Sequence, residues 1–350
     1  MPTIKDVAKK AGVSVATVSR VLNDSGYYDP EKATAVRNAV NELGYRRNIH
    51  WARLRQNASN TIGFLLGNRD TMNSMQMSLL MACERVLHKA GYDVVFTVFR
   101  YNGDDRASRL VLPRMLMQEG MLDGVILAGL HYGNLLDAFA RMKMPYVLLG
   151  NTFIGEAGEI EHDAVVYDDV AGSYEGAQYL LRQGHRRIAF VGNAQLPWFR
   201  RRYDGYLRAM KEAALQENSV VEDWQVSAIE YGQFAAAQLL RQTGQPTAIF
   251  AGNDELAAAI WKELTKRRIQ IPRDISLLGF GDRSEFSILE PSLTTISVFQ
   301  EKVGETLAQM LLAKLAKPGL LVPSRVLPCK IVERSSCGPP SSRVIVASNS

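Results

Sequence analysis

The sequence has 350 residues, of which 47% are hydrophobic and 22% charged, which is ordinary for a soluble globular chain and long enough for two or three domains. No apolar run approaches the ~18 residues that span a bilayer, and the first residues lack the apolar core of an export signal, so we expect a cytoplasmic protein with no membrane partner. Three cysteines without a Cys-x-x-Cys pair agree with a reducing compartment.

The net charge of +5 is concentrated near the N-terminus. The first sixty residues hold ten of the 41 basic side chains and five of the 36 acidic ones, so the remaining 31 and 31 balance. Lys and Arg contacts to phosphate supply the sequence-independent part of nucleic-acid affinity. The distribution therefore predicts that the N-terminal segment meets a polyanion, with a solvated charged surface as the alternative.

Two short helices are predicted first, over residues 4–11 and from 15 to about 22. Thr3 precedes the first helix, Gly12 can adopt the positive φ of a tight turn, and Ser14 can cap the second helix. Two short helices around a glycine turn form a helix-turn-helix, whose second helix enters the major groove of DNA.

The second helix has one apolar stripe, formed by Val18, Val21 and Leu22, which predicts the side that packs inward. Outside that stripe lie Val15, Ala16, Thr17, Ser19 and Arg20.

A third helix is predicted from the cap Asp29 and the first-turn Pro30 to Gly44. Its apolar stripe would close a three-helix core with Val36, Ala39, Val40 and Leu43.

The run from Thr3 to Asn23, closed by the segment 42–45, resembles the headpiece of the lactose/galactose repressor (LacI/GalR) family nearly residue for residue. The resemblance implies a DNA-binding regulator in which Val15, Ala16 and Arg20 read base edges. By the same resemblance, the remaining DNA contacts are Lys5 and the phosphate-touching Ser14, Thr17, Ser19 and Asn23. The chemistry agrees, because Arg can pair with guanine and small apolar side chains can meet a thymine methyl. For Val15 and Ala16, the alternative is that they only fill the helix.

The hinge departs from the family pattern. After Tyr45 the family normally has a proline two residues on, then a hinge helix whose leucine wedges into the minor groove. Arg47 stands in the proline position and Trp51 in the usual alanine position, while Leu54 keeps its expected distance from Tyr45. Leu54 is therefore the candidate wedge, with a linker helix that does not insert as the alternative.

From residue 61 the chain alternates short apolar runs with helical stretches, which predicts parallel β-α units. The strands are predicted over 62–66, 93–98, 124–128 and 146–149, then over 188–191, 248–251 and 276–280. The helices of the second group are predicted over 170–182, 203–215, 233–241 and 255–268. Two doubly wound lobes would leave a ligand cleft at the strand ends.

The landmarks of this region also resemble the family's periplasmic-binding-protein-like core. They cover 184–192, 202–206, 251–255, 278–282, 293–296 and 332–334. The resemblance implies three crossings between discontinuous lobes. We expect lobe one over about 61–161 plus 293–322, and lobe two over about 162–292 plus 323–337. The full arrangement would be a helix-turn-helix domain over 1–47, a hinge over 48–60, an effector-binding and dimerisation domain over 61–340, and a polar tail over 338–350.

The expected fold class is thus an all-α helix-turn-helix headpiece plus an α/β periplasmic-binding-protein-like core of two doubly wound lobes. Within that core, Arg202 matches the family's effector-binding arginine and Asn253 matches an asparagine that touches ligand. Asp282 could replace the family's usual aspartate, whose position is taken by Gly281. Trp198 could stack on a pyranose, and Asn73 is a weaker candidate. A capping or surface role is the alternative for each of them.

No catalytic constellation is visible in the sequence. The histidines form no His-x-x-x-His pair, and neither a P-loop nor a complete dinucleotide fingerprint is present, so we expect no enzyme activity, no metal site and no cofactor. The expected function is a ligand-responsive regulator, most simply a repressor, that binds a palindromic operator as a homodimer and responds to a sugar or sugar acid. The alternatives are a purine or other metabolite as effector, a sugar-binding module without specific DNA readout, and an α/β enzyme.

Overall fold

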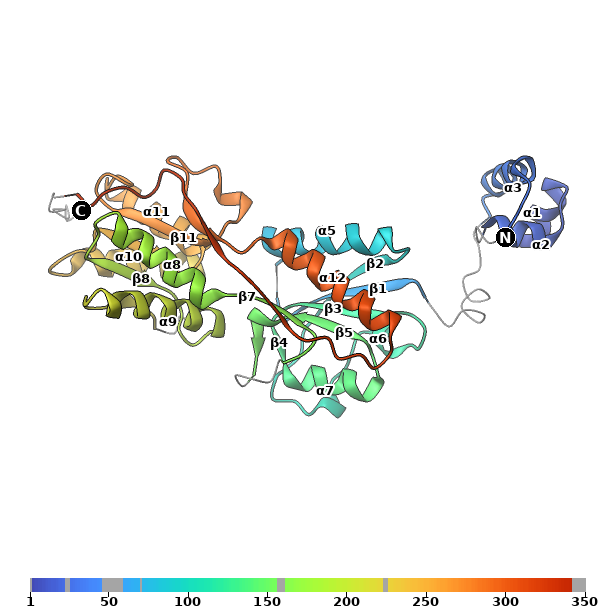
Figure 1. The fold of residues 1–350 in the computed structure, drawn as a ribbon, viewed down its shortest axis with the longest axis horizontal. Coiled ribbons are helices and arrows are strands. Elements are labelled where there is room, and N and C mark those ends of the chain that lie inside the picture. Colours follow the sequence, from blue (N-terminus) through green and yellow to red (C-terminus); the bar gives the residue numbers. More distant parts are fainter. Residues whose placement is uncertain are drawn as a thin grey trace. The chain divides into compact units, whose positions relative to one another are not determined.

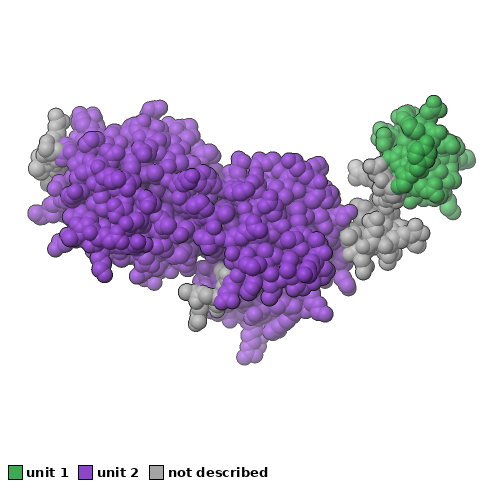
Figure 2. Space-filling view, in the orientation of Figure 1, with its two compact units in different colours: residues 1–59 green, residues 60–350 purple. Residues whose placement is uncertain are grey.

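The described part of the chain in this computed structural model comprises residues 2–22, 26–45, 59–69, 71–155, 161–222 and 226–341. It divides into two units, Met1–Ser59 and Asn60–Ser350 (Figure 2). The predicted fold class is confirmed, since the first unit is helical and the second is an α/β core with parallel-sheet lobes (Figure 1). Within the described residues, no helix is long and apolar enough to cross a membrane.

Three helices lie in the described residues of the first unit, at the predicted positions. They are α1 (Ile4–Ala11), α2 (Val15–Leu22) and α3 (Pro30–Leu43). Gly12 ends α1 with a φ of 66°, and the Oγ of Ser14 accepts a hydrogen bond from the backbone N–H of Thr17 at 3.1 Å. Asp29 caps α3 ahead of Pro30. The end of α1 and the starts of α2 and α3 therefore follow from local capping or turn residues.

The predicted apolar stripes of these helices face one another. The buried core consists of Val7, Ala8, Val18, Val21, Ala33, Val36 and Ala39. Leu22, Val40 and Leu43 pack against it, and Lys10 of α1 forms an ion pair of 2.5 Å with Glu42 of α3. Ala33 is buried although it lies outside the apolar stripe predicted for the third helix.

The second unit begins with a six-stranded sheet in the order β13-β7-β5-β3-β1-β2. Its strands are β1 (Thr61–Gly67), β2 (Asp93–Phe99), β3 (Gly124–Gly129), β5 (Tyr146–Leu149), β7 (Ala164–Tyr167) and β13 (Arg325–Leu327). Helices α5 (Ser74–Lys89) and α12 (Gln300–Ala316) pack on one face and α7 (Gly133–Met142) on the other. The short elements beside this sheet are η1 (Ala107–Arg109), α6 (Arg114–Met117), β4 (His131–Tyr132), η2 (Gly150–Thr152) and β6 (Phe153–Ile154).

A second six-stranded sheet has the order β14-β12-β11-β10-β8-β9. Its strands are β8 (Ile188–Val191), β9 (Asn218–Val220), β10 (Ala248–Ala251), β11 (Ser276–Gly281), β12 (Thr294–Ser297) and β14 (Lys330–Val332). Helices α8 (Asp169–Arg182) and α9 (Pro197–Glu212) cover one face, and α10 (Ala228–Arg241) and α11 (Asp254–Lys266) the other. Strand β14 is antiparallel to β12, and η3 (Ser284–Phe286) follows β11.

The seven predicted strands match the observed ones to within one residue at either end, but two helices begin earlier than predicted. Helix α9 starts at Pro197, not at 203, and α10 starts at Ala228, not at 233. Pro197 occupies the first helical turn, and Ser227 forms a capping box with Glu230. Both are start signals that the search for apolar periodicity passed over.

The chain passes between the two sheets after β7, after β12 and after β13. Each passage comes later than the boundary expected from the family resemblance. Strand β7 still pairs with β5 of the first sheet, β12 pairs with β11 of the second, and β13 pairs with β7 of the first. The expected boundaries at 161/162, 292/293 and 322/323 are corrected accordingly, because short edge strands carry no local sign of the sheet they join.

Candidate functional site

The exposed side of α2 is the first candidate surface. Val15 is 40% exposed although it is apolar, and Ala16 and Arg20 are exposed beside it. Val18 and Val21 are turned into the core, so one face of this short helix is buried while Val15, Ala16 and Arg20 face solvent.

The other predicted DNA contacts divide by exposure. Ser14 and Lys5 are exposed, while Thr17 and Ser19 are half-buried. The hydroxyl of Ser14 lies 2.9 Å from that of Thr17, so the cap of α2 stands at the solvent-facing start of the helix. Asn23 and Leu54 lie outside the described residues.

A cavity of about 390 Å³ in the second unit is the other candidate site. It lies where parallel strands of both sheets end, as doubly wound folds predict. Its lining comes from the first sheet and its loops (Arg69, Thr71, Asn73, Met75, Gln76, Leu149, Thr152 and Tyr167), from the second (Leu196, Trp198, Phe199, Arg202, Ala228, Asn253, Glu255, Phe280, Gly281 and Arg283), and from Val298 between β12 and α12.

Four of the five predicted effector residues line this cavity, and Asp282 does not. Asn73 and Asn253 cap α5 and α11, with each side-chain oxygen accepting a backbone N–H, so their amide N–H groups are what they can offer a ligand. The carboxylate of Asp282 accepts a hydrogen bond of 2.6 Å from Arg334. In the structure, Asp282 thus lies outside the cavity lining and is paired with Arg334.

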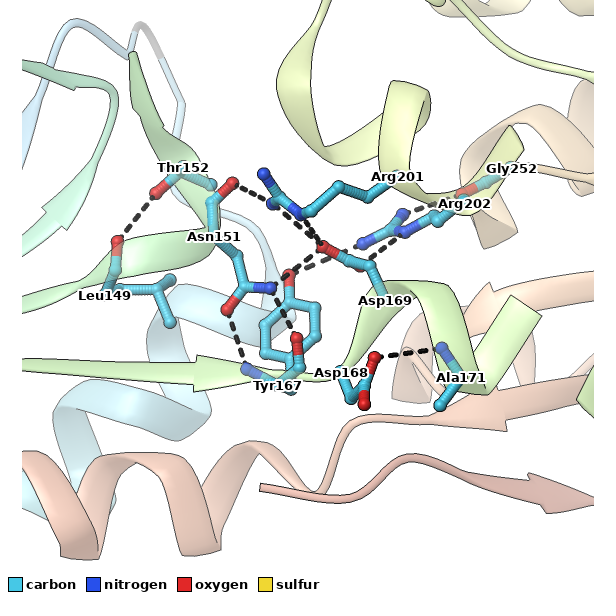
Figure 3. A network of polar contacts seen from close by, with 10 residues as sticks. All are labelled: Leu149, Asn151, Thr152, Tyr167, Asp168, Asp169, Ala171, Arg201, Arg202 and Gly252. Carbon is cyan, nitrogen blue, oxygen red and sulfur yellow. Dashed lines mark hydrogen bonds and ion pairs between the residues drawn. The ribbon is translucent and has the colours of Figure 1, made fainter. Parts of the chain in front are cut away.

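Arg202 is held by a buried ion pair (Figure 3). Its Nε donates to Oδ1 of Asp169 at 2.8 Å, its Nη1 donates to the carbonyl of Gly252 at 2.7 Å, and its Cζ lies 3.9 Å from the ring centroid of Phe280. Burial disfavours the charged form, but the attraction of Asp169, helped by Tyr167, outweighs burial and raises the pKa of Arg202. Arg202 therefore stays charged and is positioned before any ligand arrives.

The two neighbouring arginines point elsewhere, as three consecutive helical positions require. Arg200 pairs with Asp204 at the surface at 3.0 Å. Arg201 donates to Oδ2 of Asp169 and, at 2.7 Å, to the carbonyl of Asn151 in η2, which directly follows β5 of the first sheet (Figure 3). Asp169 thus joins a cavity arginine to a contact between the two lobes.

Sequence reasoning missed several of these residues. The adjacent acids Asp168 and Asp169 were assigned no role from the sequence. Asp168 caps α8, and Asp169, only 1% exposed, is the counter-ion of the network. No group of three or more metal-ligating side chains occurs among the described residues. Arg69 lies just after the end of the buried strand β1, and this position at a strand end could have identified it as a cavity residue.

Comparisons with known proteins agree with this architecture. Residues 3–48 match the family described as "Bacterial regulatory proteins, lacI family", and residues 177–337 match a "Periplasmic binding protein-like domain". The HTH-type transcriptional regulator DegA of Bacillus subtilis is 31% identical over 308 residues, which cover 86% of this chain and 88% of DegA.

Two solved structures share the fold. The Lac repressor dimer bound to operator and the anti-inducer ONPF aligns with a TM-score of 0.77 and 23% identity, covering 96% of this chain and 99% of that one. A LacI family transcriptional regulator from Enterococcus faecium with bound ribose aligns with a TM-score of 0.66 and 25% identity, covering 80% of this chain and 99% of that one.

Proposed function

Because the chain belongs to the LacI family of bacterial regulatory proteins, we propose that it represses transcription from a palindromic operator as a homodimer and that a sugar or sugar acid bound between its lobes controls this binding. The observation that carries the proposal is the solvent-facing side of α2, with Val15, Ala16 and Arg20 exposed on a helix whose other side is core. Relatives of this family are transcriptional regulators, so no catalytic role is proposed.

Effector control is supported by the network around Asp169. Arg202 lines the cavity, and the same carboxylate holds Arg201, whose other hydrogen bond reaches the first lobe. A ligand that engages Arg202 changes the balance at Asp169 and, through Arg201, favours one arrangement of the lobes. The effector shifts DNA affinity to the extent that it binds one arrangement better than the other.

The homodimer is supported by exposed apolar side chains on two neighbouring elements of the first sheet. They are Met77 and Met81 on α5 and Phe96 and Val98 on β2. Clustered exposed apolar side chains on a soluble protein mark interaction surfaces, and the similar Lac repressor structure is a dimer.

We expect sedimentation velocity to show a dimer at micromolar concentration and the double variant Met81→Glu/Phe96→Glu to weaken association about tenfold or more, because it buries charges at the interface. Val111→Glu, which changes an exposed apolar residue in the loop after η1, is the matched control and leaves the dimer intact. Equal sedimentation of the double variant and the wild type would place the interface elsewhere.

The function itself is tested by selecting operators from a random duplex pool with the full-length protein, then measuring affinity over a salt series with sugars, sugar acids and nucleobases. We expect enrichment of a palindrome and a change in its affinity with one class of metabolite. Weak binding that shows no sequence preference and disappears as salt rises would contradict the proposal, since only the phosphate contribution would remain. A response to nucleobases alone would favour a purine effector.

A further inference from the structure

Arg69 differs from every other charged residue in the cavity lining. It follows β1, and its Cζ lies 5.6 Å from the ring centroid of Trp198 on α9. Its Nε is buried and has no hydrogen-bond partner among the described residues. Burial lowers the pKa of the Arg69 guanidinium, because the charged form has lost water without gaining a bonded acceptor.

The other two arginines of the lining are already neutralised. Arg202 is paired with Asp169 at 2.8 Å. Arg283 is paired with Glu285 and, at 3.3 Å, with Glu255. Glu255 attracts Arg69 from a distance, but its carboxylate lies against Arg283. Within the described part of the chain, Arg69 is thus the lining cation that has no carboxylate within ion-pair distance.

Helix termini add to the positive field in the cavity. Helices α5 and α9 start at the lining and carry no acidic residue in their first turns, whereas α11 carries Asp254 and Glu255 in its first turn. The N-terminus of a helix has a partial positive charge that favours anions. The α11 end of the cavity supplies its own carboxylates, whereas the first turn of α9 carries none and that of α5 has only the carboxylate of Glu285, which also pairs with Arg283, close to Ser74.

We propose that the effector is a polyhydroxylated acid whose carboxylate or phosphate group binds Arg69 between the start of α5 and Trp198. The hydroxyl groups of the ligand then meet Arg202 and the amides of Asn73 and Asn253. This inference rests on the proposed function, since it names the chemical class of the effector at the same site. Because Arg69 comes from the first lobe and Trp198 from the second, the acid group also bridges the lobes.

The test is calorimetric titration of the full-length protein with compounds that share a carbon skeleton and differ in charge. The first set is D-glucose, D-glucuronate and D-glucose 6-phosphate, and the second is D-glucitol and D-gluconate. We expect at least one acid to bind about tenfold or more tightly than its neutral partner, with an affinity that falls as salt rises. Tighter binding of the carboxylates than of the phosphate would identify a carboxylate as the acid group, and the reverse order would identify a phosphate.

Substitution of the arginine assigns the effect to this position. Arg69→Gln should weaken binding of the acid by about 10- to 100-fold and bring it to the level of the neutral partner, because a charged hydrogen bond is lost. Arg69→Lys keeps the charge but lacks the planar guanidinium, so its affinity for the acid should lie between those of the wild type and Arg69→Gln. Arg200→Gln, at an exposed arginine on α9, is the control and should leave affinity unchanged.

The outcomes separate this inference from the proposed function. Tighter binding of the neutral compounds, equal binding of both members of each pair, or no loss in Arg69→Gln overturns the acid assignment and leaves the regulator intact. Failure of every acid to bind at millimolar concentration also overturns it. Operator selection without ligand tests DNA recognition independently. If Arg69→Gln unfolds, the salt dependence of acid binding and the affinity of Arg69→Lys for the acid test the assignment in its place.

Discussion

Asp169→Asn will destabilise the second unit by about 3–5 kcal/mol and abolish the response to effector. Asp169 is almost fully buried and accepts hydrogen bonds from Arg201, Arg202 and the side-chain amide of Asn151. Asparagine keeps the shape but removes the negative charge, so two guanidinium groups are left with one neutral acceptor between them. The desolvation of Arg202, which is only 5% exposed, is then no longer compensated by a negative charge, and Arg202 loses the contact that orients it toward the cavity.

The measurement is denaturant unfolding followed by tryptophan fluorescence, with effector titration of the folded fraction. Asp204→Asn is the matched control, because Asp204 also pairs with an arginine of α9. This pair lies at the surface, and the side chain of Asp204 is 42% exposed. An exposed pair contributes roughly 0–1 kcal/mol, so the control should stay close to the wild type. If the two variants had equal stability, the buried network would not hold the lobes as described.

Arg20→Ala will weaken binding to the selected operator by about 10- to 100-fold and relax the sequence preference at one base pair of each half-site. The exposed position of Arg20 on α2 leaves its guanidinium available for a paired contact with a guanine. Loss of that contact removes base discrimination, while most of the phosphate contribution remains. Binding assays on the operator and on single-base variants of it measure both effects.

Arg37→Ala on α3 is the control for this experiment, since Arg37 is equally exposed but lies on the helix that closes the core. It should change affinity for all sequences alike or not at all. Arg20→Lys tests the paired geometry, because lysine keeps the charge but cannot form the same two bonds. A uniform loss across all base variants with Arg20→Ala would make Arg20 a phosphate contact, not a base contact.

The headpiece was predictable because its determinants are local. Thr3, Gly12, Ser14 and Asp29 act within one helical turn, and the apolar spacing defines the core directly. The buried parallel strands were also predictable from the sequence, because they are continuous apolar runs between turns. The headpiece helices and the buried strands were therefore predicted closely, whereas the local start signals of α9 and α10 were missed.

The cavity was only partly predictable because its chemistry depends on distant pairs. Arg202 could be identified from the family resemblance, but its partner Asp169 lies 33 positions away and in the sequence resembles an ordinary helix-start acid. Arg69 meets Trp198 from the other lobe. Such contacts depend on the order of strands in the sheets, and the short edge strands that complete this order have no distinctive pattern of their own.

The last two strands have a consequence for synthesis of the chain. Strand β13 closes one edge of the first sheet and β14 closes one edge of the second, although Leu327 and Lys330 are close neighbours in the sequence. Neither lobe can complete its sheet until nearly the whole chain has left the ribosome, whereas the three headpiece helices are finished by Leu43. A premature stop codon just before β13 would therefore remove an edge strand from both lobes at once and still encode helices α1, α2 and α3.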